Sequence, residues 1–149
     1  MNRALREEIR EEVKRAAQRG LLCSQITVDV GLRQLGMQSH DLVKGAGGLV
    51  GAIGLQGATC GVLTSAACLL TFAAVDRLDR RVYLLIEELE ERFDDLISKY
   101  PSNCCSDILE HEPDKVPSDV CYPLIAGAIQ IVLGLLNGEG YVREQKTGT

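Results

Sequence analysis

The chain has 149 residues, of which 46% are hydrophobic and 25% are charged, a balance typical of one globular domain with a substantial core. Only 4% of the residues are aromatic and none is Trp, which argues against ring-stacking platforms for carbohydrate or single-stranded nucleic acid. Sixteen basic and 21 acidic residues give a net charge of −5, and the two signs are interspersed, so no face is expected to follow a phosphate backbone.

The first predicted element is an amphipathic helix that ends at Gly20. Leu5, Ile9 and Val13 recur at helical spacing, with charged residues between them. This N-terminal segment has no continuous apolar stretch of the kind that marks a secretory signal. We therefore expect a cytoplasmic protein, in which six cysteines favour metal or redox chemistry over structural disulfides.

Three further helices are predicted before the middle of the chain. One covers residues 21–35 and carries Cys23 in its first turn. Ser39 is the expected N-cap of a glycine-rich third helix, which we expect to break near residues 54–57 because glycine disfavours helix. A fourth helix is predicted over residues 58–75.

The most strongly amphipathic segment follows, over residues 76–100. Its apolar stripe consists of Leu78, Val82, Leu85, Leu89, Phe93, Leu96 and Ile97. The opposite face is charged throughout, and Pro101 closes the segment. The pattern predicts one long helix on the outside of the fold.

The C-terminal third is predicted as a loop with a short helix and then a final apolar helix. Ser102 or Asn103 is the expected start of the short helix, and Ser118 or Asp119 is the expected cap of the last one, which runs through Leu136.

No useful alternation of apolar and polar residues predicts a strand. We therefore predict an all-α fold, a compact bundle of about five to six helices with glycine-rich central helices. It forms one domain over residues 1–141, followed by a polar tail over residues 142–149.

The uncharged stretch GGLVGAIGLQGATCGVLTSAACLL, residues 47–70, admits three interpretations. The charge-free run of residues 45–75 is long enough for a membrane span, and residues 121–136 are a shorter candidate, but glycines dilute the first run and no aromatic belt flanks it. GAGGLVG matches neither dinucleotide-binding nor P-loop spacing.

The third interpretation, a buried helix pair around Cys60, is the one we favour. Gly47 and Gly51, like Gly57 and Gly61, are four residues apart, so each pair would share a helical face and allow close backbone approach. Gly61 would also leave room beside the Cys60 sulfur for a cofactor or a second cysteine.

The cysteines form the main candidate site. They are Cys23, Cys60, Cys68, Cys104, Cys105 and Cys121. Several lie at predicted helix starts, where the helix dipole and free N–H groups favour thiolate, the form that binds metal or attacks disulfides. There is no CxxC pair. His40 and His111 are expected to be solvated or capping residues rather than ligands.

These residues resemble the C-GCAxxG-C-C family of redox-active proteins. The resemblance lies in LCSQ with Cys23, the glycines of GGLVG, TCGVLTSA with Cys60, CSDIL with Cys105, and Cys121 at the start of the last helix. It covers roughly residues 21–136. Against the pattern CGAxxG, the chain has Val62 in place of alanine and Ser65 in place of glycine.

The resemblance implies a small helical redox protein of anaerobic or facultative bacteria and archaea. A similar domain accompanies an iron–sulfur cluster in the split-Soret cytochrome. By this resemblance the metal ligands would be Cys23, Cys60, Cys105 and Cys121, with Cys68 and Cys104 as extras. The candidate cofactor-binding glycines are Gly47, Gly48 and Gly61.

Three functional hypotheses remain open. The first is electron transfer by an iron–sulfur cluster on the four signature cysteines. The second is metal-free thiol–disulfide chemistry with Cys121 or Cys105 as a low-pKa attacking thiol, and the third is a structural or partner-binding helical protein. Zinc in the same pocket is a fourth, weaker case. We expect a homodimer, a possible redox partner protein, no nucleic acid, no membrane span and no catalytic triad or carboxylate pair.

Overall fold

The computed structural model describes residues 3–140, except for the side chains of Val75, Arg77 and Leu78. Within this range the chain is all-α, which confirms the predicted fold class. The helices are α1 (Arg3–Gln18), α2 (Cys23–Gln34), α3 (His40–Gly45), α4 (Gly61–Leu78), α5 (Val82–Leu96), α6 (Cys105–Glu110) and α7 (Pro117–Gly138). Two 3₁₀ turns, η1 (Ala46–Leu49) and η2 (Asp79–Arg81), flank α4 in the sequence. The predicted polar tail lies outside the described residues.

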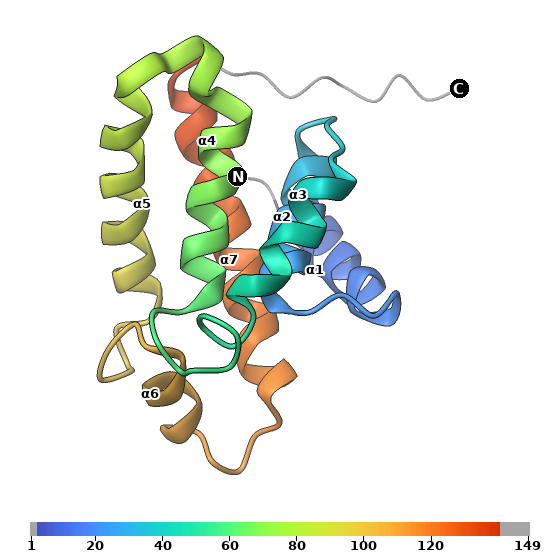
Figure 1. Cartoon of the computed structure of the whole chain (residues 1–149), viewed down its shortest axis with the longest axis vertical. Helices are drawn as coiled ribbons and strands as arrows, with labels where there is room; N and C mark the ends of the chain where they lie inside the picture. The colour runs from blue at the N-terminus through green and yellow to red at the C-terminus, as the bar shows by residue number, and fades with distance from the viewer. Residues whose placement is uncertain (1–2, 141–149) are drawn as a thin grey trace.

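Three helices define the direction of the bundle. α2, α4 and α7 begin toward the lower end in Figure 1 and run upward side by side, in mutual contact. α5 returns downward along α4 and α7, α1 packs on α2 and α7, and the short α6 lies beneath the bundle. The N-termini of the three central helices therefore converge at one end, above α6.

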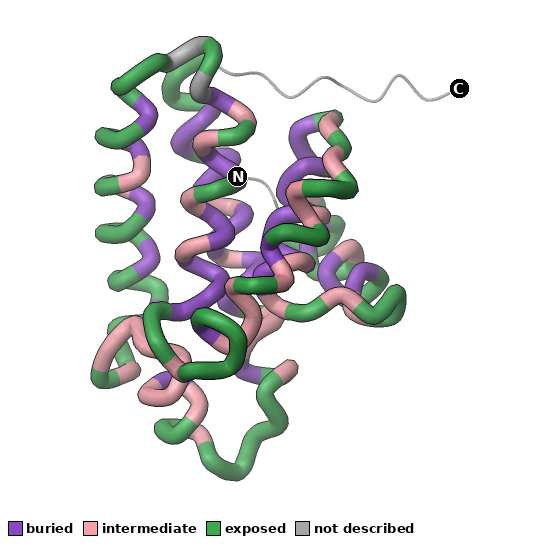
Figure 2. Tube along the Cα trace, viewed as in Figure 1, coloured by how far each residue is buried: buried purple, intermediate pink, exposed green. Residues whose placement is uncertain are grey.

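The burial pattern shows which helices lie inside the bundle and which helices cover them. α1 buries only Ile9, Val13 and Ala16, because its other residues are largely charged. α2 buries eight of its twelve residues, including three that are polar, Ser24, Thr27 and Gln34. Figure 2 shows the same contrast, with burial along α4 and the inner side of α5 and exposure on the outer side of α5. The amphipathic helices therefore cover the apolar ones, as predicted.

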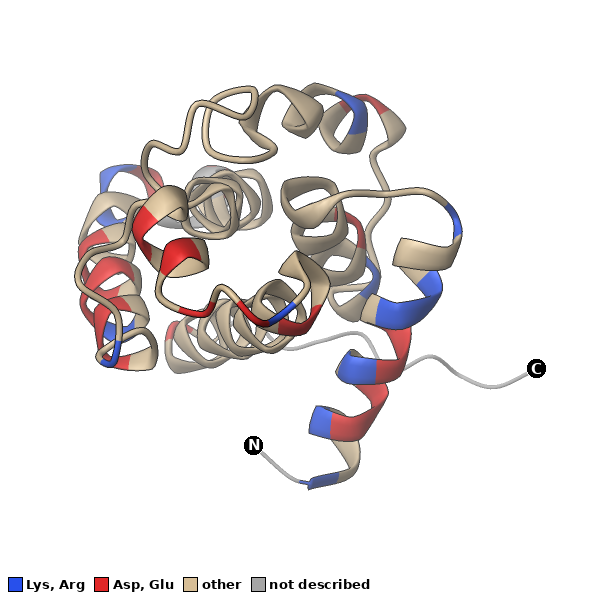
Figure 3. Ribbon diagram, turned by 90° about the horizontal axis from the view of Figure 1, so that it is seen from below, with Lys and Arg blue, Asp and Glu red and all other residues tan. Residues whose placement is uncertain are grey.

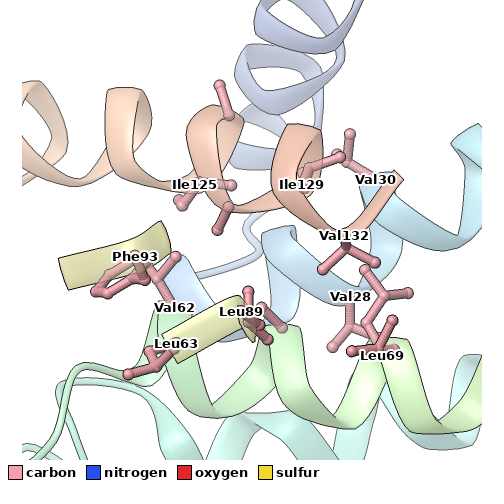
Figure 4. Close-up of a cluster of buried hydrophobic side chains, with 14 of the residues drawn as sticks. Val28, Val30, Val62, Leu63, Leu69, Leu89, Phe93, Ile125, Ile129 and Val132 are labelled. Atoms are coloured by element: carbon pink, nitrogen blue, oxygen red, sulfur yellow. The ribbon is translucent and has the colours of Figure 1, made fainter. Parts of the chain in front are cut away.

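The hydrophobic core lies between α2, α4, α5 and α7. Its centre, shown in Figure 4, includes Val28 of α2, Leu69 of α4, Phe93 of α5 and Ile129 of α7, each of which is 0% exposed. At Gly31 of α2 an added Cβ would lie 2.2 Å from a methyl carbon of Leu69, so this glycine permits close packing of α2 on α4.

The segment predicted as one helix over residues 76–100 is divided, so that prediction is wrong. Its first residues end α4, the chain turns through η2, and α5 begins only at Val82. Asp79 adopts a positive φ of 50°, a conformation that Asp tolerates better than most residues. The reversal allows α5 to bury its apolar stripe against α4 and α7, a tertiary gain that the local pattern does not contain.

The third helix is much shorter than predicted. Ser39 is its N-cap, as expected, and its hydroxyl accepts a hydrogen bond from the Leu42 N–H. α3 nevertheless ends at Gly45, and after η1 the chain forms an irregular loop over residues 50–60. Residues 51–55 of this loop all have positive φ. The glycine pairs predicted to share a helical face are therefore not on a helix, and the buried helix pair around Cys60 is not formed.

The starts of α4, α6 and α7 also differ from the prediction. α4 begins at Gly61 rather than near residue 58. Cys104 is the N-cap of α6, and Val116 precedes Pro117, the first residue of α7. Proline suits this first position because its missing N–H would have no helical partner there.

Of the two predicted membrane-span candidates, residues 45–75 do not form one continuous helix. Within residues 3–140 only α7 has the length and apolar composition of a span, and 56% of its most apolar window is buried inside the fold.

Candidate functional site

Four of the six cysteines gather at the end of the bundle where the central helices begin. Cys23 is the first residue of α2, Cys60 directly precedes α4, Cys105 opens α6, and Cys121 lies in the second turn of α7. Cys60 is buried and the other three are half-buried. These four residues are the predicted metal ligands, and the structure brings them together from four separate elements.

Electrostatic coupling shows that the four thiols form one group. A negative charge on Cys23 raises the pKa of Cys60, Cys105 and Cys121. The pKa of Cys60 is also raised by Cys105, and the pKa of Cys121 is raised by both Cys60 and Cys105. Every pair among the four therefore interacts. We call Cys23, Cys60, Cys105 and Cys121 the cysteine site.

A single antiparallel β-bridge fixes two members of this site. Thr59 pairs with Cys104, the Cys60 N–H donates to the Asn103 carbonyl (2.8 Å), and the Cys105 N–H donates to the Ala58 carbonyl (2.8 Å). Cys60 and Cys105 each follow a bridged residue and are diagonal neighbours. The bridge therefore fixes the backbone on which both cysteines lie.

Side-chain hydrogen bonds secure the segments around the bridge. The Ser106 hydroxyl and N–H both donate to the Gly57 carbonyl, at 3.0 and 3.3 Å. On the other side, the buried Ser24 hydroxyl donates to the Ala46 carbonyl (2.7 Å) and ties the start of α2 to η1. The backbone beside three of the four cysteines is therefore held in place.

Cys60 caps α4. Backbone hydrogen bonds from Val62 and Leu63 favour its thiolate, as expected at a helix start. Burial outweighs this effect, and together with the neighbouring thiols it raises the pKa of Cys60 to about 11. The predicted thiolate stabilisation is present at Cys60, but it is smaller than the cost of desolvation.

The prediction of a low-pKa attacking thiol at Cys121 or Cys105 is wrong. Burial, followed by the charge of Cys23, raises the pKa of both thiols, and that of Cys121 reaches about 12. For Cys105 the expected N–H donors are already used, because its own N–H and that of Ser106 bond to loop carbonyls. In the absence of a metal these thiols are protonated at neutral pH.

The other two cysteines and the two histidines occupy different settings, and Cys104 directly precedes Cys105. Cys68 is exposed on the outer surface of α4, and Cys104 is bridged to Thr59. His40 is exposed at the start of α3, and His111 is the C-cap of α6, where its ring meets Tyr100 edge-on at 5.5 Å. These positions agree with the roles expected for the four residues.

The three candidate glycines do not line an open cavity. An added Cβ at Gly61 would lie 2.3 Å from the Leu49 carbonyl oxygen, so backbone fills the room that we expected beside the Cys60 sulfur. At Gly47 the neighbour is the Gln25 amide at 3.1 Å, and Gly48 faces open space. Gly61 and Gly47 thus permit close packing of η1 on the starts of α4 and α2.

A polar cluster beside Cys121 was not predicted. Glu112 accepts hydrogen bonds from the Tyr100 hydroxyl, Lys115 (2.7 Å) and Lys99 (3.3 Å). These bonds lower the pKa of Glu112 to about 2, while burial and Glu112 raise the pKa of Tyr100 to about 12. The cluster ties the end of α5 to the loop before α7. Its members are separated in sequence and follow no motif, so only the fold reveals it.

The donor set suits a thiophilic metal centre, but it does not form a compact single-ion site. Among the described residues, no three His, Cys, Asp or Glu side chains are arranged to hold one metal ion. Four cysteine thiolates are nevertheless the usual ligands of iron–sulfur clusters.

Comparison with known proteins identifies the class of protein. Residues 21–135 match the model of the family described as "Putative redox-active protein (C_GCAxxG_C_C)". This match covers more than half of the chain, so the protein belongs to that family. Searches of curated proteins and of solved structures gave no match.

The family motif corrects one detail of the sequence analysis. It reads GCAxxG, so its cysteine is the second residue. Aligned on Cys60, the motif falls on residues 59–64, and the departures are Thr59, Gly61 and Thr64 rather than Val62 and Ser65. At the position of the motif alanine this chain has Gly61, where the Leu49 carbonyl leaves no room for a methyl group.

Proposed function

We propose that this member of the family is an electron-transfer protein that holds an iron–sulfur cluster on Cys23, Cys60, Cys105 and Cys121. The observation that supports the proposal is the convergence of exactly these four cysteines, with mutual electrostatic coupling, from four elements of the fold. When bound, such a cluster would supply reversible uptake and release of one electron.

The protein's own residues have distinct roles in this proposal. All four cysteines would ligate the cluster as thiolates, so the raised pKa of three of them means that binding must release protons. The N–H groups of Val62 and Leu63 already face the Cys60 sulfur and would stabilise its negative charge. The apolar core beneath Cys60 would limit access of water from the inside.

The same raised pKa values weigh against metal-free thiol–disulfide exchange. The attacking species in that chemistry is the thiolate, which is scarce when the pKa lies well above the ambient pH.

The test is anaerobic purification followed by a visible spectrum and analysis of iron, sulfide and zinc. We expect iron and sulfide with absorbance in the visible range. Replacing Cys23, Cys60, Cys105 or Cys121 singly by Ala should lower the iron content severalfold, whereas Cys68→Ala should retain it. Cys104→Ala is the sharper control, because it removes the thiol next to a proposed ligand.

Other results would refute the proposal that the protein holds a cluster. A colourless protein, free of iron after iron-replete anaerobic expression, would do so. If two thiols were then lost reversibly on oxidation, the function would be thiol–disulfide chemistry. If all four Cys→Ala substitutions together left a folded and functional protein, the cysteines would be packing residues.

A further inference from the structure

We infer that the end of the molecule that carries the cysteine site is a docking surface for a positively charged, one-electron carrier protein. This inference rests on the proposed function and adds the kind of partner and the place where it binds. It is supported by three features of this end: exposed apolar side chains, a strained loop that presents two of them, and an excess of acidic residues.

The first feature is a set of exposed apolar side chains on segments that adjoin the cysteines. Leu22, next to Cys23, is 56% exposed, and Val116, the N-cap of the helix that carries Cys121, is 57% exposed. In the loop that is hydrogen-bonded to α6, Ile53 and Leu55 are 55% and 78% exposed. Four large apolar side chains are thus exposed on segments that adjoin the cysteine site, and clustered apolar exposure is typical of a surface that meets another molecule.

The second feature is the backbone that holds Ile53 and Leu55 outward. Ala52, Ile53 and Leu55 have φ values of 59°, 59° and 70°, a left-handed conformation that is a genuine outlier for a β-branched residue such as Ile. Backbone of this kind persists where the surroundings enforce it, often at functional sites. Here Gly57 and Ala58, at the base of the loop, bond to Ser106 and Cys105.

The third feature is the charge around these apolar groups. Residues 104–119, which include α6 and lead into α7, contain five acidic residues and one basic residue, Lys115. The segments over residues 21–25 and 50–60 have no charge. Figure 3 views the molecule from this end and shows acidic groups on α6 and on the segment that follows it, beside uncharged loops. An apolar contact area bordered by acidic groups complements a partner with a basic rim.

The reaction would be a simple outer-sphere transfer. Once a reductant such as dithionite had reduced this protein, one electron would pass to the oxidised carrier docked at this end, and no covalent bond would form or break. Because such encounters are brief, a small contact area that is steered by charge suffices.

The test uses two variants that spare the backbone. Ile53→Asn and Leu55→Asn remove the apolar side chains and place a residue that tolerates positive φ. The matched control is Leu84→Asn, since Leu84 is 66% exposed on α5, which is itself strongly acidic. Melting temperatures of all three would show that each protein is folded.

The probe is mitochondrial cytochrome c, a small basic electron carrier. We expect binding of the oxidised cytochrome, measured by calorimetry, to weaken at least tenfold between 20 and 200 mM salt, roughly the effect expected for steering by several charges. The double variant Ile53→Asn, Leu55→Asn should weaken binding at least fivefold, a loss of about 1 kcal/mol, and Leu84→Asn should leave it unchanged. After reduction with dithionite, the rate of electron transfer should follow the same order.

The inference would be overturned by binding that is insensitive to salt and to the loop variants, or by a larger loss with Leu84→Asn. Binding is measured without reduction, so it tests the docking surface separately from the cluster. Normal binding without electron transfer would refute the proposed function and leave the surface intact. If the rate of electron transfer were the same in the loop variants as in the native protein, the docking surface would be refuted and the proposed function would stand.

Discussion

At the scale of single residues, Gly61 shows how closely the site is packed. An added Cβ would lie 2.3 Å from the carbonyl oxygen of Leu49, and neither backbone can give way without moving η1 or the start of α4. We therefore expect Gly61→Ala to destabilise the protein by about 1–3 kcal/mol, as overpacking does. Urea unfolding at equilibrium measures this change.

Gly134→Ala is the control for that substitution. Gly134 is exposed in α7 with nothing within 4 Å of an added Cβ, so alanine should raise stability by about 0.5–1 kcal/mol through helix propensity. Equal stability changes at the two positions would show that the contact with Leu49 is not rigid.

At the level of residues, the sequence could single out the cysteines, because their order and their places near helix starts carry a signal of their own. The fold places these four thiols near one another, and their role as ligands stays a prediction. The glycines were misinterpreted, since spacing cannot distinguish a packed helical face from a left-handed loop. Gly51, Gly54 and Gly57 have positive φ, which is a property of the backbone path.

At the scale of elements, the cluster around Glu112 joins the end of α5 to the loop before α7. Its carboxylate is held charged by Lys115, Tyr100 and Lys99, so the pKa of Glu112 falls from 4.5 to about 2. A lowered pKa contributes stability that is present above pH 4.5 and is lost as the pH falls toward 2. We expect Glu112→Gln to flatten the loss of stability over that interval, as measured by urea unfolding at several pH values.

Tyr100 makes a corresponding pH-dependent contribution to stability, on the alkaline side. Burial and the bond to Glu112 raise the pKa of Tyr100 from 10 to about 12. The protonated phenol is favoured in the folded state, so its contribution is complete below pH 10 and disappears as the pH rises to 12. Tyr100→Phe should abolish this part of the alkaline transition, and Tyr83→Phe, at an exposed tyrosine of α5, should not. Identical alkaline profiles for Tyr100→Phe and the native protein would contradict the role of the hydroxyl.

Element prediction was accurate for the helices with a clear periodic pattern and poor at reversals. α1, α2 and α7 were found close to their true bounds, because each combines helical periodicity with a recognisable start or stop. The turn at Asp79 was missed, since DRLDRR contains neither glycine nor proline and is a good helix sequence by itself. Packing of α5 against α4 decides the reversal, and that is a contact between segments, not a local property.

At the scale of the whole molecule, the homodimer expected from the sequence stays a prediction. Sedimentation should give twice the monomer mass of 16.2 kDa at micromolar concentration. Phe72, 41% exposed on α4, offers a probe of that face, and Phe72→Glu should shift the equilibrium toward monomer if the face is the interface. A single monomeric species for the native chain would refute the dimer.

The spread of the four cysteines along the chain has a thermodynamic consequence. They span residues 23 to 121 and belong to four elements, so a centre bonded to all of them would cross-link nearly the entire fold. Closing a loop of about a hundred residues lowers the entropy of the unfolded chain by an amount worth about 4–5 kcal/mol. The melting temperature would then report on occupancy of the centre, and removing it with a chelator would loosen the fold from α2 to α7.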